Sequence, residues 1–216
     1  MDPFHERLAR LALEVAADYG FCLAGGYAVQ AHGFVDRVSK DVDLFTTMAS
    51  AADFPAAQAA VVTALAAHGL AVAVEREGAT FARLVVADPG SGETSTLELG
   101  VDWRAFPPVQ LAIGPVLHPV DAAANKLCAL FGRAAVRDYI DVHAVLQDGR
   151  YTGPELLQMA ADHDPGFEPA MFAEALRAVI RLPAAAFEPY KLTADQVEAL
   201  CVRLLAWAEE IEAGNS

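Results

Sequence analysis

The sequence predicts an α+β protein, with a mixed β-sheet and flanking helices in its N-terminal half and helices alone in its C-terminal half. Two observations carry this prediction. Segments of strand type, which are short and apolar or alternating, are confined to the first half, with glycine-rich turns among them. After Pro119 the apolar residues recur at helical spacing, and several segments begin with proline or threonine. We therefore expect two domains, over 1–114 and 115–216, with the boundary near 114–118.

Hydrophobic periodicity sets the expected elements in each half. Apolar residues at helical spacing predict a first helix that Gly20 ends, and an alanine-rich helix is closed by Gly69. In the first half, helices are expected over 4–19, 27–32 and 56–68, and strands over 21–24, 41–46, 70–74, 81–87 and 95–103. In the second half, helices are expected over 119–131, 136–146, 154–162, 169–180 and 193–211.

Composition places the chain among ordinary globular proteins. Its 216 residues are 55% hydrophobic and 20% charged, which allows a substantial core and excludes the disordered class. The net charge of −14 disfavours a protein that coats nucleic acid at large, and argues only weakly against one specific RNA substrate.

The expected location is the cytoplasm, with no role for a membrane. No apolar run approaches the roughly 20 residues that span a bilayer, and residues 1–10 lack the apolar stretch of a signal peptide. Cys22, Cys128 and Cys201 are widely spaced in apolar stretches. We therefore expect buried reduced thiols rather than disulfides or zinc ligands.

The strongest chemical signal is an aspartate pair two residues apart. In a strand, Asp41 and Asp43 project from one face, about 6.5 to 7 Å apart along the chain, while Val42 and Leu44 face the core. Two such carboxylates repel each other unless a cation lies between them, and Mg²⁺ takes carboxylate oxygens together with substrate phosphates. The pair therefore predicts a site for Mg²⁺ or Mn²⁺. A bare Asp-x-Asp is also compatible with a solvated strand edge.

A third carboxylate is expected from the strand over 95–103. Its leucines alternate with Glu98, Gly100 and Asp102, which share the other face. If this strand lies beside that of Asp41, either Glu98 or Asp102 completes a set that could hold two metal ions. We favour Glu98 as the third metal ligand and keep Asp102 as the alternate.

Glycines and polar residues upstream of the aspartates suggest a phosphate site. Gly25 and Gly26 follow a short strand and open a helix, where the backbone can approach a phosphate closely. Arg37 and Ser39 lie between these glycines and the aspartates, and we expect both to contact phosphate. For Arg37, a surface charge is the alternative.

The second half carries a further set of charged residues on predicted helices. Lys126 and Arg133 are seven residues apart and share a helix face, so both can point toward one anion. Because Lys126 lies in an apolar run, we expect it to have an anionic partner, either a phosphate or Asp138. Asp138 itself is either catalytic or part of an orienting salt bridge, and Arg137 and Asp141 have the spacing of a helix pair.

These motifs together resemble the nucleotidyltransferase superfamily, and in particular the AbiEii/AbiGii toxin family, in which a glycine pair is followed by an aspartate pair. In that family a lysine and an Arg-Asp-x-x-Asp segment, here Lys126 and residues 137–141, complete the nucleotide site. The resemblance covers roughly 23–146 and implies a nucleotidyltransferase-like fold, with a catalytic domain and a helical domain that completes the site. The chain departs from the motif in its wider glycine-to-aspartate spacing and in Gly26, where many members carry serine.

The resemblance implies a metal-dependent enzyme that moves an NMP from an NTP to a hydroxyl group, with a tRNA 3′ end as acceptor and a cognate antitoxin as partner. Two alternatives stay open: transfer to a small hydroxylated molecule, as in antibiotic nucleotidyltransferases, and a non-catalytic nucleotide-binding module, which the complete carboxylate set disfavours. The expected catalytic residues are Asp41, Asp43, Glu98, Lys126 and Asp138. The expected nucleotide-binding residues are Gly25, Gly26, Arg37, Ser39, Lys126, Arg133 and Arg137.

Overall fold

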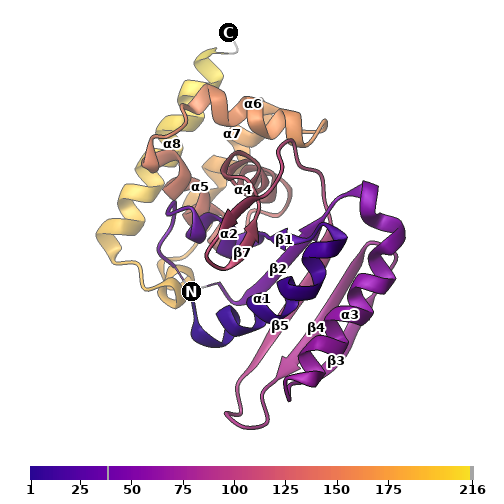
Figure 1. Ribbon diagram of the computed structural model, residues 1–216. Helices are drawn as coiled ribbons and strands as arrows, with labels where there is room; N and C mark the ends of the chain where they lie inside the picture. The colour runs from indigo at the N-terminus through magenta and orange to yellow at the C-terminus, as the bar shows by residue number, and fades with distance from the viewer. Residues whose placement is uncertain (38, 215–216) are drawn as a thin grey trace. The chain divides into compact units, whose positions relative to one another are not determined.

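The fold is seen in a computed structural model that describes residues 1–37 and 39–214 (Figure 1). The chain forms two compact units. One contains residues 1–32 and 39–119, and the other contains residues 33–37 and 120–214. The short segment 33–37, which precedes the aspartate strand in sequence, thus belongs to the helical unit.

The first unit is built on a seven-stranded mixed sheet with the order β3-β4-β5-β2-β1-β7-β6. Strand β2 pairs in parallel with β5, and β1 pairs in parallel with β7, whereas the other neighbours are antiparallel. The predicted mixed sheet is therefore confirmed. The strands are β1 (Cys22–Leu23), β2 (Asp41–Thr46), β3 (Ala71–Glu77), β4 (Phe81–Ala87), β5 (Thr94–Val101), β6 (Val109–Leu111) and β7 (Gly114–Val116).

Local sequence signals explain where the first helices start and stop. The Asp2 side chain accepts hydrogen bonds from the first backbone N–H groups of α1, and Pro3 occupies the first helical position. Gly20, with a φ of 76°, ends the following turn. The helices of this unit are α1 (Pro3–Ala16), α2 (Gly25–Ala31) and α3 (Phe54–Ala67), with 3₁₀ turns η1 (Ala17–Tyr19) and η2 (Met48–Asp53).

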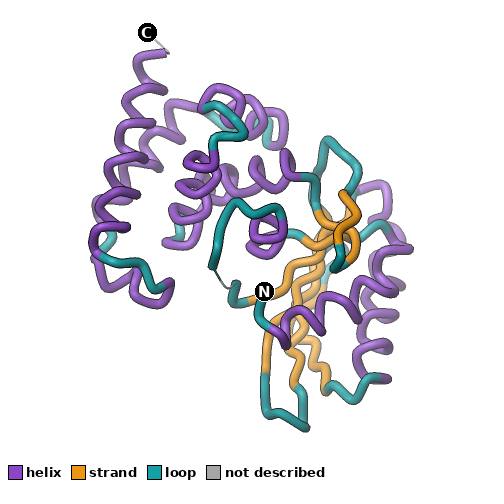
Figure 2. The backbone as a smooth tube through the Cα atoms, turned by 60° about the vertical axis from the view of Figure 1, so that its left-hand side comes forward, coloured by secondary structure: helices purple, strands orange, loops and turns teal. Residues whose placement is uncertain are grey.

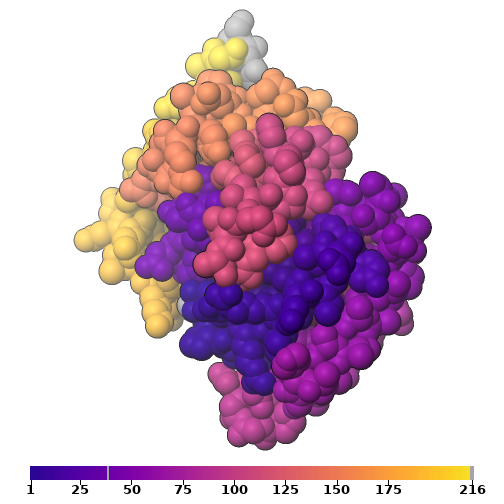
Figure 3. Space-filling view, viewed as in Figure 1, coloured from indigo at the N-terminus to yellow at the C-terminus, as the bar shows by residue number. Residues whose placement is uncertain are grey.

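The core of the first unit lies between one face of the sheet and two helices. Helices α1 and α3 lie side by side over the strands, and from this side they form a continuous surface (Figures 1 and 3). The inward-facing side chains of the central strands, such as Val42, Leu44 and Leu97, are fully buried. Because side chains alternate along a strand, the aspartates of β2 project from the opposite face.

The second unit contains helices and connecting loops in its described residues (Figure 2). Its core includes Phe172 and Trp207, whose rings meet edge to face with their centroids 5.4 Å apart. The elements are α4 (Pro119–Arg133), α5 (Val136–Asp148), α6 (Gly153–His163), α7 (Pro169–Arg177), η3 (Ala178–Arg181), η4 (Ala184–Tyr190) and α8 (Ala194–Gly214). The predicted helical C-terminal half is confirmed. Among the described residues, the structure contains no helix with the length and apolar character that crossing a membrane requires.

Two strands of the sheet were not predicted. Strands β6 and β7 have three residues each and lie where the sequence suggested a boundary between domains. Segments so short carry no readable alternation, and β7 is fixed by pairing with the distant strand β1, Leu23 opposite Val116. Strand β5 also ends at Val101, so Asp102 lies beyond it and not within the strand as predicted.

Candidate active site

Strand β2 places the two aspartates on one face of the sheet. Asp41 and Asp43 are half-buried, whereas Val42 and Leu44 on the other face are fully buried. The strand runs between β1 and β5 inside the sheet, so pairing on both sides fixes the backbone of both aspartates. The predicted shared orientation of the two aspartates is therefore present.

Gly25 lies directly against the second of these carboxylates. It begins α2 with a left-handed φ of 58°, and a Cβ atom built on it would lie 1.7 Å from Oδ2 of Asp43. The backbone N–H of Ala24 donates to the carbonyl oxygen of Asp43 at 2.8 Å. A residue without a side chain is therefore required at this position. Gly26, the next residue of α2, is buried.

Ser39 lies beside the first carboxylate. Its hydroxyl donates to Oδ1 of Asp41 at 3.1 Å, and its side chain is buried. The residue predicted to contact phosphate is thus engaged with Asp41 in this structure. The structure brings Gly25, Ser39 and the two aspartates together at the start of β2 and α2.

Register decides which acidic residue of β5 faces the aspartates. Asp43 is paired with Glu98 across the parallel ladder, so the two side chains share a face, about 4.8 Å apart between strands. Asp102 lies past the end of β5, where its N–H donates to the carbonyl of Thr46 at 2.8 Å. Glu98 is therefore the carboxylate directly beside Asp43.

Glu98 is held by an arginine that the sequence analysis missed. Its Oε1 accepts hydrogen bonds from Nε of Arg83 at 2.8 Å and from Nη2 at 2.7 Å. The hydrogen bonds and the charge of Glu98 raise the pKa of Arg83. The available signal was that Arg83 and Glu98 lie on neighbouring strands of a hairpin and on the same face. The register of the hairpin then pairs them.

The two aspartates suit a hard cation. Mg²⁺ usually keeps several waters and binds proteins through one or two carboxylates together with substrate phosphates, so a half-buried pair on one strand face fits this ion. Within residues 1–37 and 39–214, no three aspartate, glutamate, histidine or cysteine side chains are grouped so that they alone could hold a metal ion. The expected third carboxylate, Glu98, is turned to Arg83 instead.

In the helical unit, two cations share one buried carboxylate. Asp141 is fully buried, and both of its oxygens accept from Arg37, through Nε and Nη2 at 2.6 Å each. Nζ of Lys126 lies 3.1 Å from Oδ2 of the same residue. The guanidinium of Arg37 also lies over the ring of Tyr190, 5.9 Å from its centroid. Two partners were expected for Lys126, a phosphate or Asp138. The second was wrong, because Asp141 takes the place of Asp138.

The charges of this cluster stabilise one another. Burial alone would raise the pKa of the Asp141 carboxyl, but Lys126 and Arg37 outweigh it and lower that pKa. Burial would likewise lower the pKa of Arg37, and the hydrogen bonds and charge of Asp141 raise it. Both shifts favour the ionised forms of Asp141 and Arg37. The cluster combines two basic side chains with one carboxylate.

Asp138 binds Arg133 rather than Lys126. Its two oxygens accept from Nε and Nη2 of Arg133 at 2.9 and 2.8 Å, and Oδ2 also accepts from the N–H of Ala135 at the start of α5. Lys126 and Arg133 therefore bind separate carboxylates here. Arg137 lies half-buried in the first turn of α5.

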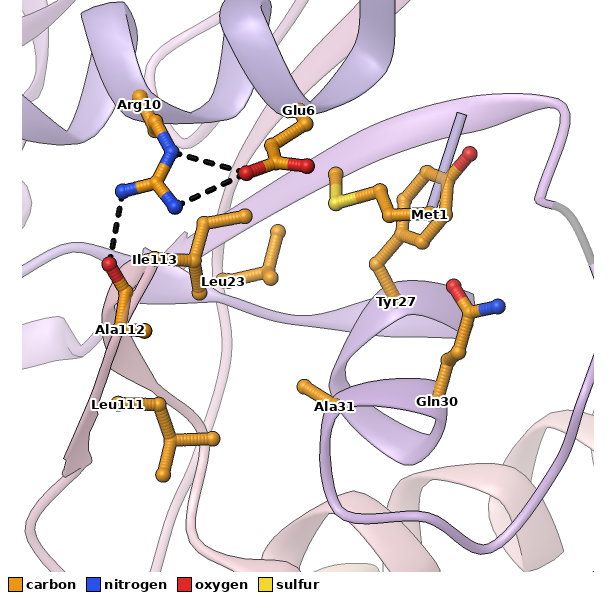
Figure 4. A pocket seen from close by; sticks show the side chains of 10 residues that line it. All are labelled: Met1, Glu6, Arg10, Leu23, Tyr27, Gln30, Ala31, Leu111, Ala112 and Ile113. Carbon is orange, nitrogen blue, oxygen red and sulfur yellow. Dashed lines mark hydrogen bonds and ion pairs between the residues drawn. The ribbon is translucent and has the colours of Figure 1, made fainter. Parts of the chain in front are cut away.

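Two cavities, one in each unit, are lined by other described residues. In the first unit, a cavity of about 330 Å³ lies between α1, α2, β1 and the β6–β7 hairpin (Figure 4). Glu6 and Arg10 form an ion pair at its edge. In the helical unit, a cavity of about 250 Å³ lies along α5 and α8 beside His143. None of the predicted site residues lines either cavity.

Comparison with known proteins gives one family. The family model described as nucleotidyl transferase AbiEii toxin, type IV toxin–antitoxin system, matches residues 7–200. Among curated proteins, none matches the chain.

Solved structures share the fold at low identity. A candidate nucleotidyltransferase from H. pylori is 20% identical, with 97% of this chain and 94% of that one covered and a TM-score of 0.63. JHP933 from Helicobacter pylori is 21% identical, with 97% and 91% covered and a TM-score of 0.62. MenT4, a nucleotidyltransferase toxin from Mycobacterium tuberculosis, is 17% identical, with 95% and 83% covered and a TM-score of 0.62.

Proposed function

The chain belongs to the AbiEii family of nucleotidyltransferase toxins, and on this basis we propose that it moves a nucleoside monophosphate from an NTP to a hydroxyl group, depends on Mg²⁺ or Mn²⁺, and releases pyrophosphate. The observation that carries the proposal is the pair Asp41 and Asp43 on one sheet face, with Gly25 leaving room for the second carboxylate.

In this proposal Asp41 and Asp43 hold the metal ion. Their carboxylates face the same side, and the hydroxyl of Ser39 fixes Oδ1 of Asp41. When bound, the ion neutralises charge that develops on the phosphates during transfer. The protein's own side chains and backbone accept the proton and bind the triphosphate.

Glu98 is the proposed acceptor of the proton from the attacking hydroxyl, or a further metal ligand. It lies next to Asp43 in the parallel ladder, and Arg83 holds its carboxylate through Oε1. Arg83 contacts Oε1, which leaves Oε2 for either role. Asp102, which lies beyond the strand, is the weaker candidate.

The basic residues of the helical unit are the proposed contacts for the triphosphate. Lys126 and Arg37 share Asp141, and the net positive charge of this buried group favours a bound anion. Arg133 and Arg137 belong to the same proposal, together with the backbone at Gly25 and Gly26. Asp138 would act by orienting Arg133, which it binds through both oxygens.

The decisive experiment replaces the aspartates one at a time. Asp41→Ala and Asp43→Ala should keep the circular dichroism spectrum of the wild type and lose release of pyrophosphate from labelled NTPs at saturating Mg²⁺. Near-normal turnover in either variant contradicts the metal assignment. A non-catalytic module would bind NTP in all three proteins and release pyrophosphate in none.

The proposed acceptor is the 3′ end of a tRNA, and the proposed partner is a cognate antitoxin. A second candidate acceptor, a small hydroxylated molecule, is favoured by the net charge of −14, which repels polyanions at long range. Incubation with each labelled NTP, Mg²⁺ and total RNA distinguishes the two. Label in the tRNA band that disappears when the 3′ hydroxyl is oxidised supports tRNA, and unlabelled RNA alongside consumed NTP supports a small acceptor.

A further inference from the structure

A chain of hydrogen bonds reaches from helix α1 to the first aspartate. Nδ1 of His5 lies 2.5 Å from the hydroxyl of Tyr27, and its Nε2 lies 2.7 Å from the hydroxyl of Ser95. The Tyr27 hydroxyl donates to the carbonyl oxygen of Ser39 at 3.3 Å. The Ser39 hydroxyl then donates to Oδ1 of Asp41 at 3.1 Å.

Each hydroxyl has one hydrogen to donate, so the direction of this chain depends on the tautomer of His5. With hydrogen on Nδ1, His5 donates to the Tyr27 oxygen, and Tyr27 donates its own hydrogen to the carbonyl oxygen of Ser39. Nε2 of His5 then accepts a hydrogen bond from Ser95. Burial raises the pKa of Tyr27 to about 12, so the hydroxyl keeps the hydrogen that it donates. Burial also lowers the pKa of His5, which favours the neutral ring.

Helix α2 approaches Asp43 directly and is linked to Asp41 through Ser39. Its first residue, Gly25, lies against Asp43, and Tyr27 two positions later reaches Asp41 by way of Ser39. Ser39 precedes the strand that begins at Asp41, so its carbonyl lies outside the β2 ladder. The hydrogen bond from Tyr27 therefore fixes the residue that in turn fixes the Asp41 carboxylate.

The tyrosine combines a buried ring with a hydrogen-bonded hydroxyl. The residue is 1% exposed, and its ring forms one wall of the 330 Å³ cavity, while its hydroxyl points away from Gln30 and Ala31 (Figure 4). The imidazole of His5 meets the ring edge to face, with the centroids 5.5 Å apart. Packing therefore holds the ring, and the hydroxyl links it to Ser39.

We propose that Tyr27 and His5 are positioning residues for metal binding, which hold Ser39 so that its hydroxyl keeps the Asp41 carboxylate oriented toward the ion. This inference rests on the proposed role of Asp41 as a metal ligand. It assigns a function in the reaction to two residues of α1 and α2 that contact neither metal nor nucleotide.

The first test removes only the tyrosine hydroxyl. Tyr27→Phe should raise the Mg²⁺ concentration for half-maximal pyrophosphate release by about threefold to tenfold, which is the worth of one net hydrogen bond, with the NTP KM unchanged at saturating Mg²⁺. Tyr139→Phe is the matched control. Tyr139 is as buried as Tyr27, at 1% exposed each, and donates to the carbonyl of Ala175 in the helical unit at 2.9 Å. It should lower thermal stability and leave the Mg²⁺ dependence unchanged.

The second test uses the two amides that each imitate one imidazole nitrogen. His5→Asn places an N–H donor near the position of Nδ1 and should retain most of the wild-type Mg²⁺ dependence. His5→Gln places its amide near the position of Nε2, so it should behave like Tyr27→Phe. In the wild type, ¹⁵N chemical shifts of His5 should report hydrogen on Nδ1 at neutral pH.

The outcomes separate this inference from the proposed function. Transfer by Asp41→Ala and Asp43→Ala would overturn the metal site itself. If those variants are inactive while Tyr27→Phe keeps the wild-type Mg²⁺ dependence, the positioning role alone is refuted. Equal behaviour of His5→Asn and His5→Gln, or hydrogen on Nε2 of His5, also refutes it.

Discussion

Gly25 and Gly69 both adopt a left-handed backbone, but only Gly25 has a functional group where its side chain would be. With φ values of 58° and 78°, either one carries a cost of about 1–2 kcal/mol when replaced by an L-residue. A Cβ at Gly25 would lie 1.7 Å from Oδ2 of Asp43, whereas a Cβ at Gly69 meets nothing within 4 Å. Comparing alanine substitutions at the two positions therefore separates the effect of backbone strain from the effect of displacing the Asp43 carboxylate.

We expect Gly25→Ala and Gly69→Ala to lower the free energy of unfolding, and Gly25→Ala alone to abolish nucleotidyl transfer. Urea denaturation measures the first effect and pyrophosphate release per folded molecule measures the second. Full activity in Gly25→Ala would mean that Asp43 moves without consequence and is not a metal ligand.

Asp141 is the residue on which the cation cluster depends. Replacing it by asparagine leaves Arg37 and Lys126 buried beside a neutral group, which should lower the free energy of unfolding by about 3–5 kcal/mol at pH 7. The control is Asp148→Asn, because the ion pair of Asp148 with Arg150 is partly exposed and worth about 1 kcal/mol or less. Urea unfolding of the three proteins at pH 7 measures both differences.

The same group predicts the acid sensitivity of the fold. The pKa of Asp141 is lower in the folded state than in the unfolded state, where it is about 3.9. The stability that Asp141 contributes is therefore complete above the unfolded pKa and is lost as the pH falls through the folded pKa. The difference in free energy of unfolding between wild type and Asp141→Asn should therefore be constant from pH 7 to 5, and should become smaller below about pH 4. A difference in free energy of unfolding that already becomes smaller between pH 7 and 5 contradicts the lowered pKa of Asp141.

At the scale of elements, the register between β2 and β5 selects the third carboxylate. Asp43 is opposite Glu98, and Asp102 is past the end of the strand. We expect Glu98→Gln to lower kcat by about 10²-fold or more, as loss of a general base does, and Asp102→Asn to stay within a few-fold of wild type. Single-turnover assays at saturating Mg²⁺ and NTP measure the chemical step. Loss of activity in Asp102→Asn with an active Glu98→Gln would transfer the role to Asp102.

At the scale of the whole molecule, the net charge of −14 should decide how salt affects the reaction. The range of electrostatic repulsion falls from about 30 Å at 0.01 M salt to about 8 Å at 0.15 M. With an RNA acceptor, we expect kcat/KM for the RNA to rise over this interval, because screening weakens the repulsion between two polyanions. With an uncharged small acceptor, kcat/KM for the acceptor should not change with salt. A steep fall for RNA would indicate a local basic patch that outweighs the net charge.

Local patterning by itself determined the class of fold and the central pair of the site. The bounds predicted for β2 and β4 agree with the structure, in which buried and partly exposed side chains alternate along both strands. The same alternation put Asp41 and Asp43 on one face. Five further helical segments after Pro119 were read from spacing, and the structure has helices at each of them.

Only the tertiary structure decided which distant groups meet. The pairing of Asp43 with Glu98, and of Glu98 with Arg83, depends on strand register, which no single strand encodes. Arg37 and Asp141 are 104 positions apart and meet because the segment 33–37 packs with the helical unit. Periodicity reports which way a side chain faces relative to its own element. Which partner it meets depends on how elements pack, and that is settled by burial and hydrogen bonding summed over the whole fold.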